Sequence, residues 1–324
     1  MKIIIGTRGS ALALWQARFV ADELTGLRPD LEVELSVIKT SGDIIRDVPL
    51  AKIGAKGLFT KEIEEALIDG AVDLAVHSMK DLPTELPSGL QLSAIMEREN
   101  PCDAFISRDG SKLEDLGPGA KVGTSSLRRR AFLLAKRPYL QIKDIRGNVD
   151  TRIKKIDKEG LDGALLACAG VIRMGMSHRI TEALSAEEMI PAIGQGAMGI
   201  ETREDDGKIL ELVKPLNHLS TAACVAMERA FLYRMGGGCQ VPLAAHAWEE
   251  DGRIELISAV VHPDGSPIII NRRNISEPDP NLGLIAADDI LSQGGDKVLR
   301  SVLGADWSLG EDTEMIMRWP NYHG

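Results

Sequence analysis

One local pattern occurs twice along this chain: a short apolar stretch, a turn of glycine, serine and threonine, and a helix start with arginine beside it. The first copy occupies residues 2–24, and Ser10 is the predicted N-cap of its helix. The second copy occupies residues 121–130, with Thr124, Ser125 and Ser126 in the turn. Because backbone N–H groups at a helix start attract anions, the repeat predicts two α/β halves with an anion-binding turn in each.

A predicted strand ends on a carboxylate at Asp81. Apolar residues of Val72–Val76 alternate with small or polar ones, the run breaks at His77, and Pro83 stops it. In open α/β sheets, polar side chains just beyond the carboxyl end of a strand line the ligand crevice. Asp81 is therefore a candidate for chemistry, although Lys80 and Asp81 also fit an ordinary turn exposed to solvent.

The length of 324 residues predicts two or three domains. The strand and helix pattern restarts near Asn100, and the glycine-punctuated stretch Ile190–Gly199 is the predicted return from the second half into the first. Beyond the predicted helix Leu219–Arg234, alternating strands and two helices fit a small α+β unit. The predicted fold class is α/β, with two lobes joined by two crossovers and a third domain; the boundaries are 1–98 with 196–216, then 99–195, then 217–324.

Composition narrows the function. Apolar residues make up 44% and charged residues 27% of the chain, as in soluble globular proteins, and no apolar run has the roughly 20 residues of a membrane span. The start, Met1–Gly6, is interpreted as a strand and not as a signal peptide. The four cysteines show no close-spaced metal pattern, which favours a reducing cytoplasm and predicts no metal. The net charge of −10 argues against general nucleic-acid binding.

The positive charge is concentrated in one segment. Residues 121–160 contain 12 lysines and arginines but only four aspartates and glutamates, a balance suited to a small, multiply anionic ligand. Three consecutive predicted strands end near Ser125 and Ser126, near Arg146 and near Arg173, a regularity that is hard to attribute to chance. A plain solvated face is the alternative.

Two further segments leave alternatives open. Residues 50–59 place lysines among glycines and predict either a lid or an ordinary loop. Cys168, in the predicted buried strand Gly163–Ala169, and Cys224, on an apolar helix face, fit small core residues. Cys239 follows three glycines that free the backbone to present its sulfur, so it is a covalent tether or an inert loop thiol.

Several long motifs together resemble the porphobilinogen deaminase family, also called the hydroxymethylbilane synthases. They stand in the family's order and cover nearly the whole chain: Thr7–Gln16, Lys56–Phe59, Val76–Pro83, Gly123–Arg129, Arg146–Val149 and Gly238–Pro242. The resemblance implies two lobes like those of type II periplasmic binding proteins and an α+β domain that carries a cofactor cysteine. It implies a transferase of tetrapyrrole biosynthesis that condenses four porphobilinogen units, with loss of ammonia, into hydroxymethylbilane.

The resemblance also assigns roles to residues. Asp81 is the expected catalytic residue, and Cys239 is expected to form a thioether with a dipyrromethane cofactor. Further cofactor contacts are implied for Lys80, Asp81, Ser10, Thr124, Ser125, Ser126, Arg128, Arg129 and Arg146. Substrate contacts are implied for Arg8, Ser10, Phe59, Arg146, Arg152, Arg173 and Gln195. A cytoplasmic monomer without nucleic-acid or membrane partners is expected.

Two other functions are weighed against this one. An anion-binding module without catalysis would use the same arginines, but it accounts neither for the glycine-flanked Cys239 nor for a third domain. Nucleic-acid binding by Leu127–Lys158 fits poorly, because the net charge is negative and aromatic residues are not interleaved with the basic ones.

Overall fold

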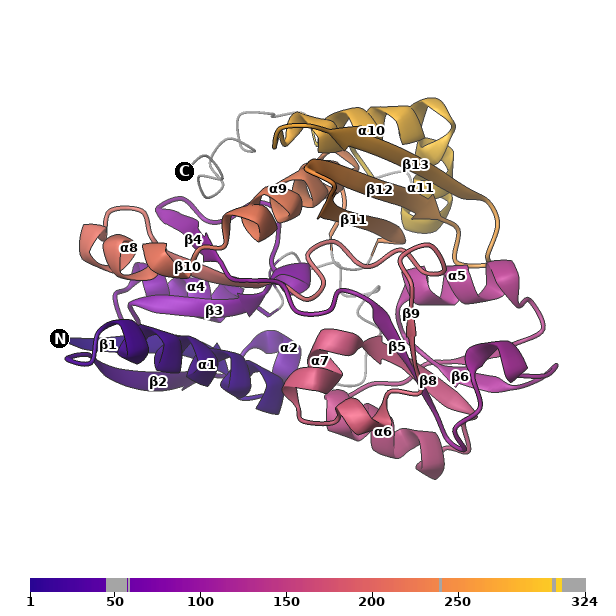
Figure 1. Cartoon of the computed structure of the whole chain (residues 1–324), viewed down its shortest axis with the longest axis horizontal. Coiled ribbons are helices and arrows are strands. Elements are labelled where there is room, and N and C mark those ends of the chain that lie inside the picture. Colours follow the sequence, from indigo (N-terminus) through magenta and orange to yellow (C-terminus); the bar gives the residue numbers. More distant parts are fainter. Residues whose placement is uncertain (45–56, 58, 239–240, 305–306, 311–324) are drawn as a thin grey trace.

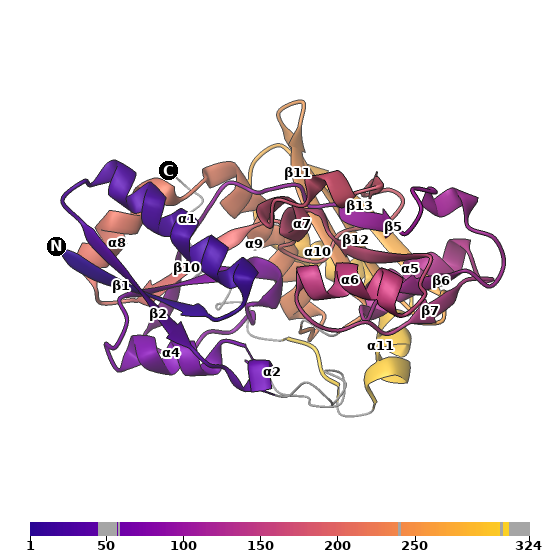
Figure 2. The same cartoon turned by 90° about the horizontal axis from the view of Figure 1, so that it is seen from below.

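Three separate β-sheets organise the chain, with two of them side by side and the smallest above them (Figure 1). This computed structural model describes residues 1–44, 57, 59–238, 241–304 and 307–310. Seen from below, the first and second halves lie along the long axis of the molecule (Figure 2). None of the helices described combines the length and apolarity needed to cross a membrane.

The first sheet has the order β2-β1-β3-β10-β4. Strands β1, β2 and β3 are parallel, whereas β10 runs antiparallel to both of its neighbours. The strands are β1 Lys2–Arg8, β2 Glu32–Ile38, β3 Leu74–Ser78, β4 Leu90–Ile95 and β10 Met198–Arg203. The helices are α1 Ala11–Leu27, α2 Ser41–Ile44, α4 Lys61–Ile68 and α8 Gly207–Val213, with one-turn helices η1 Met79–Asp81 and η4 Lys214–Leu216.

Apolar periodicity explains how these helices pack. Helix α1 buries Ala17, Val20 and Leu24 on one side, and together with α8 these residues cover the sheet face that contains Ile3 and Ile5. Helix α4 covers the opposite face. Ser10 caps α1 as predicted, because its hydroxyl oxygen accepts a hydrogen bond of 3.3 Å from the Ala13 N–H.

The second sheet repeats this plan in the order β7-β6-β8-β5-β9. Strands β6, β7 and β8 are parallel, and β5 is antiparallel to both neighbours. The strands are β5 Asp103–Ser107, β6 Lys121–Gly123, β7 Gln141–Lys143, β8 Gly163–Ala167 and β9 Glu182–Leu184. The helices are α5 Leu127–Lys136, α6 Val149–Lys158 and α7 Cys168–Arg173, with one-turn helices η2 Leu113–Asp115 and η3 Ser177–Arg179.

Each of these two sheets has one antiparallel strand inserted between the third and fourth of its other strands. In the first sheet this strand is β10, which follows all the strands of the second lobe in the sequence. In the second sheet it is β5, the first strand after the crossover from the first half. The predicted pair of α/β lobes is confirmed, while the exact domain boundaries stay a prediction.

The third domain is a three-stranded antiparallel sheet packed against helices, in agreement with the predicted α+β unit. Its elements are α9 Leu219–Arg234, β11 Leu243–Glu250, β12 Arg253–Val261, β13 Ile268–Ile275, α10 Asn281–Ser292 and α11 Gly295–Leu303. Helix α9 packs so closely on α10 that a Cβ added at Gly283 would stand 2.0 Å from the Met227 carbonyl oxygen. This close packing fixes α9 within the domain.

Some sequence predictions were wrong in detail. The buried strand predicted at Gly163–Ala169 ends at Ala167, and Cys168 begins the short helix α7 instead. Arg173 therefore ends a helix and not a strand. Helix α9 has no single apolar face, because all residues of 221–233 are buried. Cys168 and Cys224 are nevertheless buried, as expected of core residues.

A buried carboxylate joins the third domain to the two crossovers between the lobes. The first crossover, residues 96–102, leads from β4 to β5, and the second crossover, residues 185–197, leads from β9 to β10. Glu228 of α9 accepts hydrogen bonds from both terminal nitrogens of Arg98, at 2.7 and 2.9 Å, and from the Gly194 N–H at 2.7 Å. The Ala247 N–H of β11 donates a further bond of 2.8 Å. Burial acts to raise the pKa of Glu228, but the Arg98 charge and hydrogen bonds from His246 and Arg98 hold it at about 2.

Replacing this carboxylate should destabilise the protein in a pH-dependent way. We expect Glu228→Gln to lower the free energy of unfolding near neutral pH by about 3–5 kcal/mol, because Arg98 keeps its buried charge. A carboxyl with a lowered pKa stabilises the fold above its ordinary value of 4.5 and loses that contribution as the pH falls toward 2. Urea denaturation should show the two proteins converging over this range.

The exposed Glu250, on β11, provides the control. Glu250→Gln should change the free energy of unfolding by less than about 0.5 kcal/mol at every pH. A difference between wild type and Glu228→Gln that stays constant from neutral pH to pH 2 would contradict the assignment.

Candidate active site

The acid turn, residues 79–81, follows directly on β3 and forms the one-turn helix η1. The Met79 N–H donates to the Ala197 carbonyl oxygen at 3.0 Å. Gly194 has a φ of +68°, and a Cβ there would stand 2.8 Å from the Met79 Cβ, so this position requires glycine. The second crossover thus supports the turn from behind, while Lys80 and Asp81 remain only partly buried.

Charged groups from both lobes meet around this turn. Burial lowers the pKa of Lys80; the charges of Arg129 and Arg152 lower it further, while Asp81 and Asp103 act to raise it. Burial also lowers the pKa of Arg152, and the nearby positive charge of Arg129 adds to the effect. Asp81 and basic side chains of both lobes therefore lie close enough together for their charges to act on one another.

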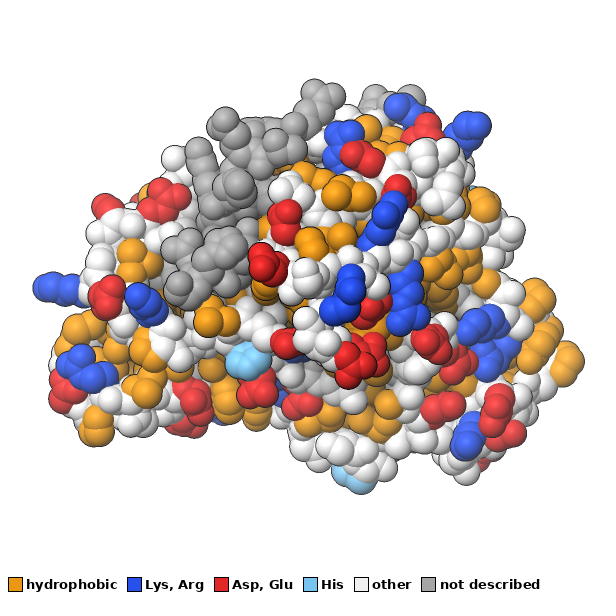
Figure 3. Space-filling view, turned by 45° about the horizontal axis from the view of Figure 1, so that its top comes forward, with side chains coloured by type: hydrophobic (Ala, Val, Ile, Leu, Met, Phe, Trp, Pro, Cys, Tyr) orange, Lys and Arg blue, Asp and Glu red, His pale blue; other side chains and the backbone are white. Residues whose placement is uncertain are grey.

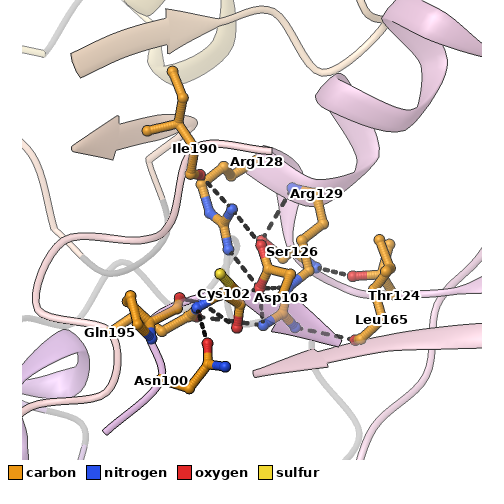
Figure 4. A network of polar contacts seen from close by, with 11 residues as sticks. Asn100, Cys102, Asp103, Thr124, Ser126, Arg128, Arg129, Leu165, Ile190 and Gln195 are labelled. Carbon is orange, nitrogen blue, oxygen red and sulfur yellow. Dashed lines mark hydrogen bonds and ion pairs between the residues drawn. The ribbon is translucent and has the colours of Figure 1, made fainter. Parts of the chain in front are cut away.

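A buried carboxylate, Asp103, gathers arginine side chains inside the second lobe (Figure 4). Arg128 donates to its two oxygens at 2.7 and 3.1 Å, and Arg129 donates through Nε at 2.9 Å. Burial acts to raise the pKa of Asp103, but the two arginines outweigh it and hold that pKa far below its usual range. Asp103 therefore stays charged and orients both guanidinium groups.

Gln195 completes the Asp103 network from the second crossover. Its side-chain nitrogen donates to Asp103 at 3.0 Å and to the Pro101 carbonyl oxygen at 2.6 Å, and its oxygen accepts from Arg129 at 3.4 Å (Figure 4). Arg128 also donates to the Ile190 carbonyl oxygen at 2.6 Å. The network therefore joins the start of β5 to the second crossover.

The hydroxyl residues of the second-lobe turn are used locally. Ser126 caps α5 by accepting from the Arg129 N–H at 3.4 Å, and Thr124 accepts from the Ser126 N–H at 3.2 Å. Ser125 donates to the Ile145 carbonyl oxygen at 2.7 Å. These bonds fix the start of α5, with Arg128 and Arg129 in its first turn.

Two of the predicted site arginines lie over aromatic rings of the first lobe. The Arg8 guanidinium lies 4.2 Å from the centre of the Phe59 ring. The Arg173 guanidinium carbon lies 5.7 Å from the centre of the Trp15 ring, and its Nη2 donates to the Gly196 carbonyl oxygen at 2.8 Å. Helix α7 of the second lobe therefore contacts both α1 and the second crossover.

The sequence-predicted residues thus separate into two groups. The charges of Asp81, Arg129 and Arg152 act on Lys80, and those of Asp81, Arg129 and Arg146 act on Arg152. Arg128, Gln195 and also Arg129 are buried and hydrogen-bonded to Asp103, so they support the site from inside the second lobe. On the face in Figure 3, by contrast, basic and acidic side chains are interspersed.

Cys239 and most of the predicted lid, residues 50–56 and 58, lie outside the described residues. Their placement relative to Asp81 therefore stays a prediction, and so do the roles assigned to the individual site residues.

Sequence reasoning missed Asp103, Glu228 and Arg229. The signal was present, because Asp103 opens an apolar strand and the other two stand in the middle of an apolar helix. Charged residues are almost never fully buried unless paired, so each of these positions implied a distant partner. The sequence pattern could not say which partner.

The arrangement has a definite chemical capacity. Guanidinium groups bind carboxylates through paired hydrogen bonds, and a carboxylate such as Asp81 accepts N–H donors and stabilises nearby positive charge. Fold and site together define a two-lobed α/β protein whose basic side chains and Asp81 suit a multiply anionic ligand. 

Comparison with known proteins identifies the family. Residues 3–211 match the family model "Porphobilinogen deaminase, dipyromethane cofactor binding domain", and residues 222–292 match "Porphobilinogen deaminase, C-terminal domain". The porphobilinogen deaminase of Pelobacter propionicus is 52% identical over 301 residues, covering 92% of this chain and 96% of the relative. That of Syntrophotalea carbinolica is 50% identical over 301 residues, covering 92% and 95%. The chain belongs to the porphobilinogen deaminase family.

The similar solved structures share much less sequence with this chain. The methionine binding protein MetQ has a TM-score of 0.41 at 15% identity and covers 66% of this chain and 89% of its own. An arginine-specific periplasmic binding protein from Salmonella typhimurium has a TM-score of 0.35 at 16% identity, with coverages of 67% and 91%.

The two groups of arginines should differ in their contribution to stability. We expect Arg128→Met to lower the free energy of unfolding by about 3–5 kcal/mol, because it removes a buried counter-charge of Asp103. Arg152→Met should lower it by less than about 1 kcal/mol, because Arg152 is half-buried and faces like charge. Chemical denaturation of both variants measures the difference, and equal losses would contradict this division.

Proposed function

We propose that this protein joins four porphobilinogen molecules head to tail, with loss of one ammonia at each addition, and releases hydroxymethylbilane by hydrolysis. One observation carries the proposal: Asp81, in the one-turn helix that follows β3, lies close enough to Lys80 and Arg152 for its charge to act on both. Membership of the porphobilinogen deaminase family supports it.

The charges around Asp81 fit a dipyrromethane cofactor, whose pyrroles carry acetate and propionate groups. Burial and like charge lower the pKa of Lys80, Arg129 and Arg152, so added carboxylates would relieve repulsion among them. When bound, the cofactor supplies a pyrrole with a nucleophilic ring carbon as the primer. We assign its covalent attachment to Cys239 and its carboxylate contacts to residues of both lobes: Lys80, Arg129, Arg146, Ser10, Thr124, Ser125 and Ser126.

Asp81 supplies the central interaction of the proposed reaction. Its carboxylate accepts hydrogen bonds from pyrrole N–H groups and stabilises the positive charge that develops on the substrate ring as ammonia leaves. This is the counterpart, with the sign reversed, of an oxyanion hole. Because Asp81 is only partly buried, it can also accept a proton and return it to solvent.

The arginines bind the substrate's carboxylates in this proposal. A buried, unpaired carboxylate would cost several kcal/mol, and each charge-assisted hydrogen bond contributes roughly 1.5–3 kcal/mol. Arg8, Arg146, Arg152 and Arg173 are assigned to direct contacts, with Phe59 and Ser10 at the first-lobe border. Arg128 and Gln195 act through Asp103, which they share with Arg129.

The proposed enzyme is a cytoplasmic monomer whose partners are small molecules. Among the described residues, Cys102, Cys168 and Cys224 are free thiols, a state that a reducing compartment maintains.

Removing the Asp81 charge should slow turnover strongly and leave the fold intact. We expect Asp81→Asn to lower kcat by about 10²–10³-fold, because the substrate's positive charge loses its stabilising partner. Hydroxymethylbilane formation and thermal unfolding should be measured on the same sample. Asp69→Asn, at the exposed end of α4, is the control and should keep wild-type turnover. Wild-type rates in Asp81→Asn would refute the role of Asp81.

Intact-protein mass spectrometry tests the proposed tether. Wild type should carry the added mass of one dipyrromethane, and Cys239→Ser should lack both that mass and activity. Cys102→Ser should retain both, because the hydrogen bonds of Cys102 to Asn100, Cys168 and Gln195 use its backbone, which serine keeps. Retention of the added mass in Cys239→Ser would place the attachment elsewhere.

A further inference from the structure

We propose that Arg229 of α9 is a positioning residue that holds the acid turn in place for the reaction; this inference rests on the proposed function. Arg229 is 1% exposed. Its Nη1 donates to the Leu82 carbonyl oxygen at 3.1 Å, and its Nη2 donates to those of Pro83 at 2.7 Å and Thr84 at 3.3 Å. These three carbonyls follow Asp81 directly in the sequence.

The electrostatics of Arg229 distinguish this contact from ordinary packing. Burial lowers the pKa of Arg229 to about 10, against the opposing effect of the Glu201 charge. A guanidinium group buried to this extent destabilises a fold unless well-oriented hydrogen bonds replace those it made with water. Here the planar fork meets three consecutive carbonyls, which restrains the backbone on the C-terminal side of Asp81 in one conformation.

The other side of the acid turn is held through the same part of α9. Glu228 binds the Gly194 N–H, and Gly194 packs against Met79 at the start of the turn. Adjacent residues of one helix therefore fix both ends of the segment that presents Asp81. Helix α9 ends at Arg234, and its chain leads through Gly236–Gly238 to Cys239.

Three variants test the role of Arg229. Arg229→Met keeps an unbranched, flexible side chain but removes its charge and hydrogen bonds, and Arg229→Lys keeps the charge but replaces the planar fork by one ammonium. Arg234→Met is the matched control on the same helix, because Arg234 contacts Asp288 and the Gly310 carbonyl oxygen and is closer to Cys239 in the sequence. Rates are expressed per cofactor-loaded molecule, counted by intact mass.

We expect Arg229→Met to lower kcat by about 10–100-fold with a change in KM below about threefold, because the acid is misplaced while binding of the substrate's carboxylates is retained. Arg229→Lys should fall between Arg229→Met and wild type. Arg234→Met should stay within about twofold of wild type. Wild-type kcat in loaded Arg229→Met would overturn the proposal, as would equal losses in Arg229→Met and Arg234→Met.

Hydrogen–deuterium exchange provides a readout that needs neither activity nor the methionine variant. In Arg229→Lys, amides of residues 79–86 should exchange faster than in wild type, while those of β12 should not change. Unchanged exchange of residues 79–86 would overturn the proposal even if kcat falls. The proposed function fails separately, if wild-type protein forms no hydroxymethylbilane.

Discussion

The Glu228 carboxylate is the interaction on which the relative placement of the three domains depends. It is fully buried and accepts hydrogen bonds from Arg98 in the first crossover, from the Gly194 N–H in the second and from β11 of its own domain. A carboxylate in that position has no solvent to replace a lost partner, so all these groups must come together at once. Both crossovers are therefore joined to α9 at one point, and the acid turn is supported by the same helix.

A second buried carboxylate determines how the site's positive charge is divided. Asp103 pairs with Arg128 and, together with Gln195, binds Arg129. Two positive charges of α5 are therefore engaged inside the second lobe. Lys80 and Arg152 remain with lowered pKa values at the junction of the lobes. These two cations therefore lie near Asp81, where the carboxylates of the proposed cofactor and substrate would meet them.

The extent to which the sequence predicted this protein depended on how local each feature is. Ser10 as a cap and Asp81 at a strand end follow from neighbours within a few residues, and both positions were predicted. Asp103, Glu228 and Arg229 were missed because their partners are far away in sequence; Arg98 and Glu228 are 130 residues apart. For the same reason the sequence assigned Arg128 and Arg152 alike to ligand binding, although the structure buries the first against Asp103 and leaves the second partly exposed.

The position of β10 has a consequence for how the chain acquires its structure during synthesis. This strand lies between β3 and β4, yet it is encoded after every strand of the second lobe. All five strands of the second sheet come from the continuous stretch 103–184. On the ribosome, the second lobe can therefore complete its sheet first. The first lobe is made earlier, but β3 and β4 remain unpaired on the sides that β10 later covers. Newly made chains are thus most prone to wrong strand pairing at β3 and β4 until residues 198–203 emerge.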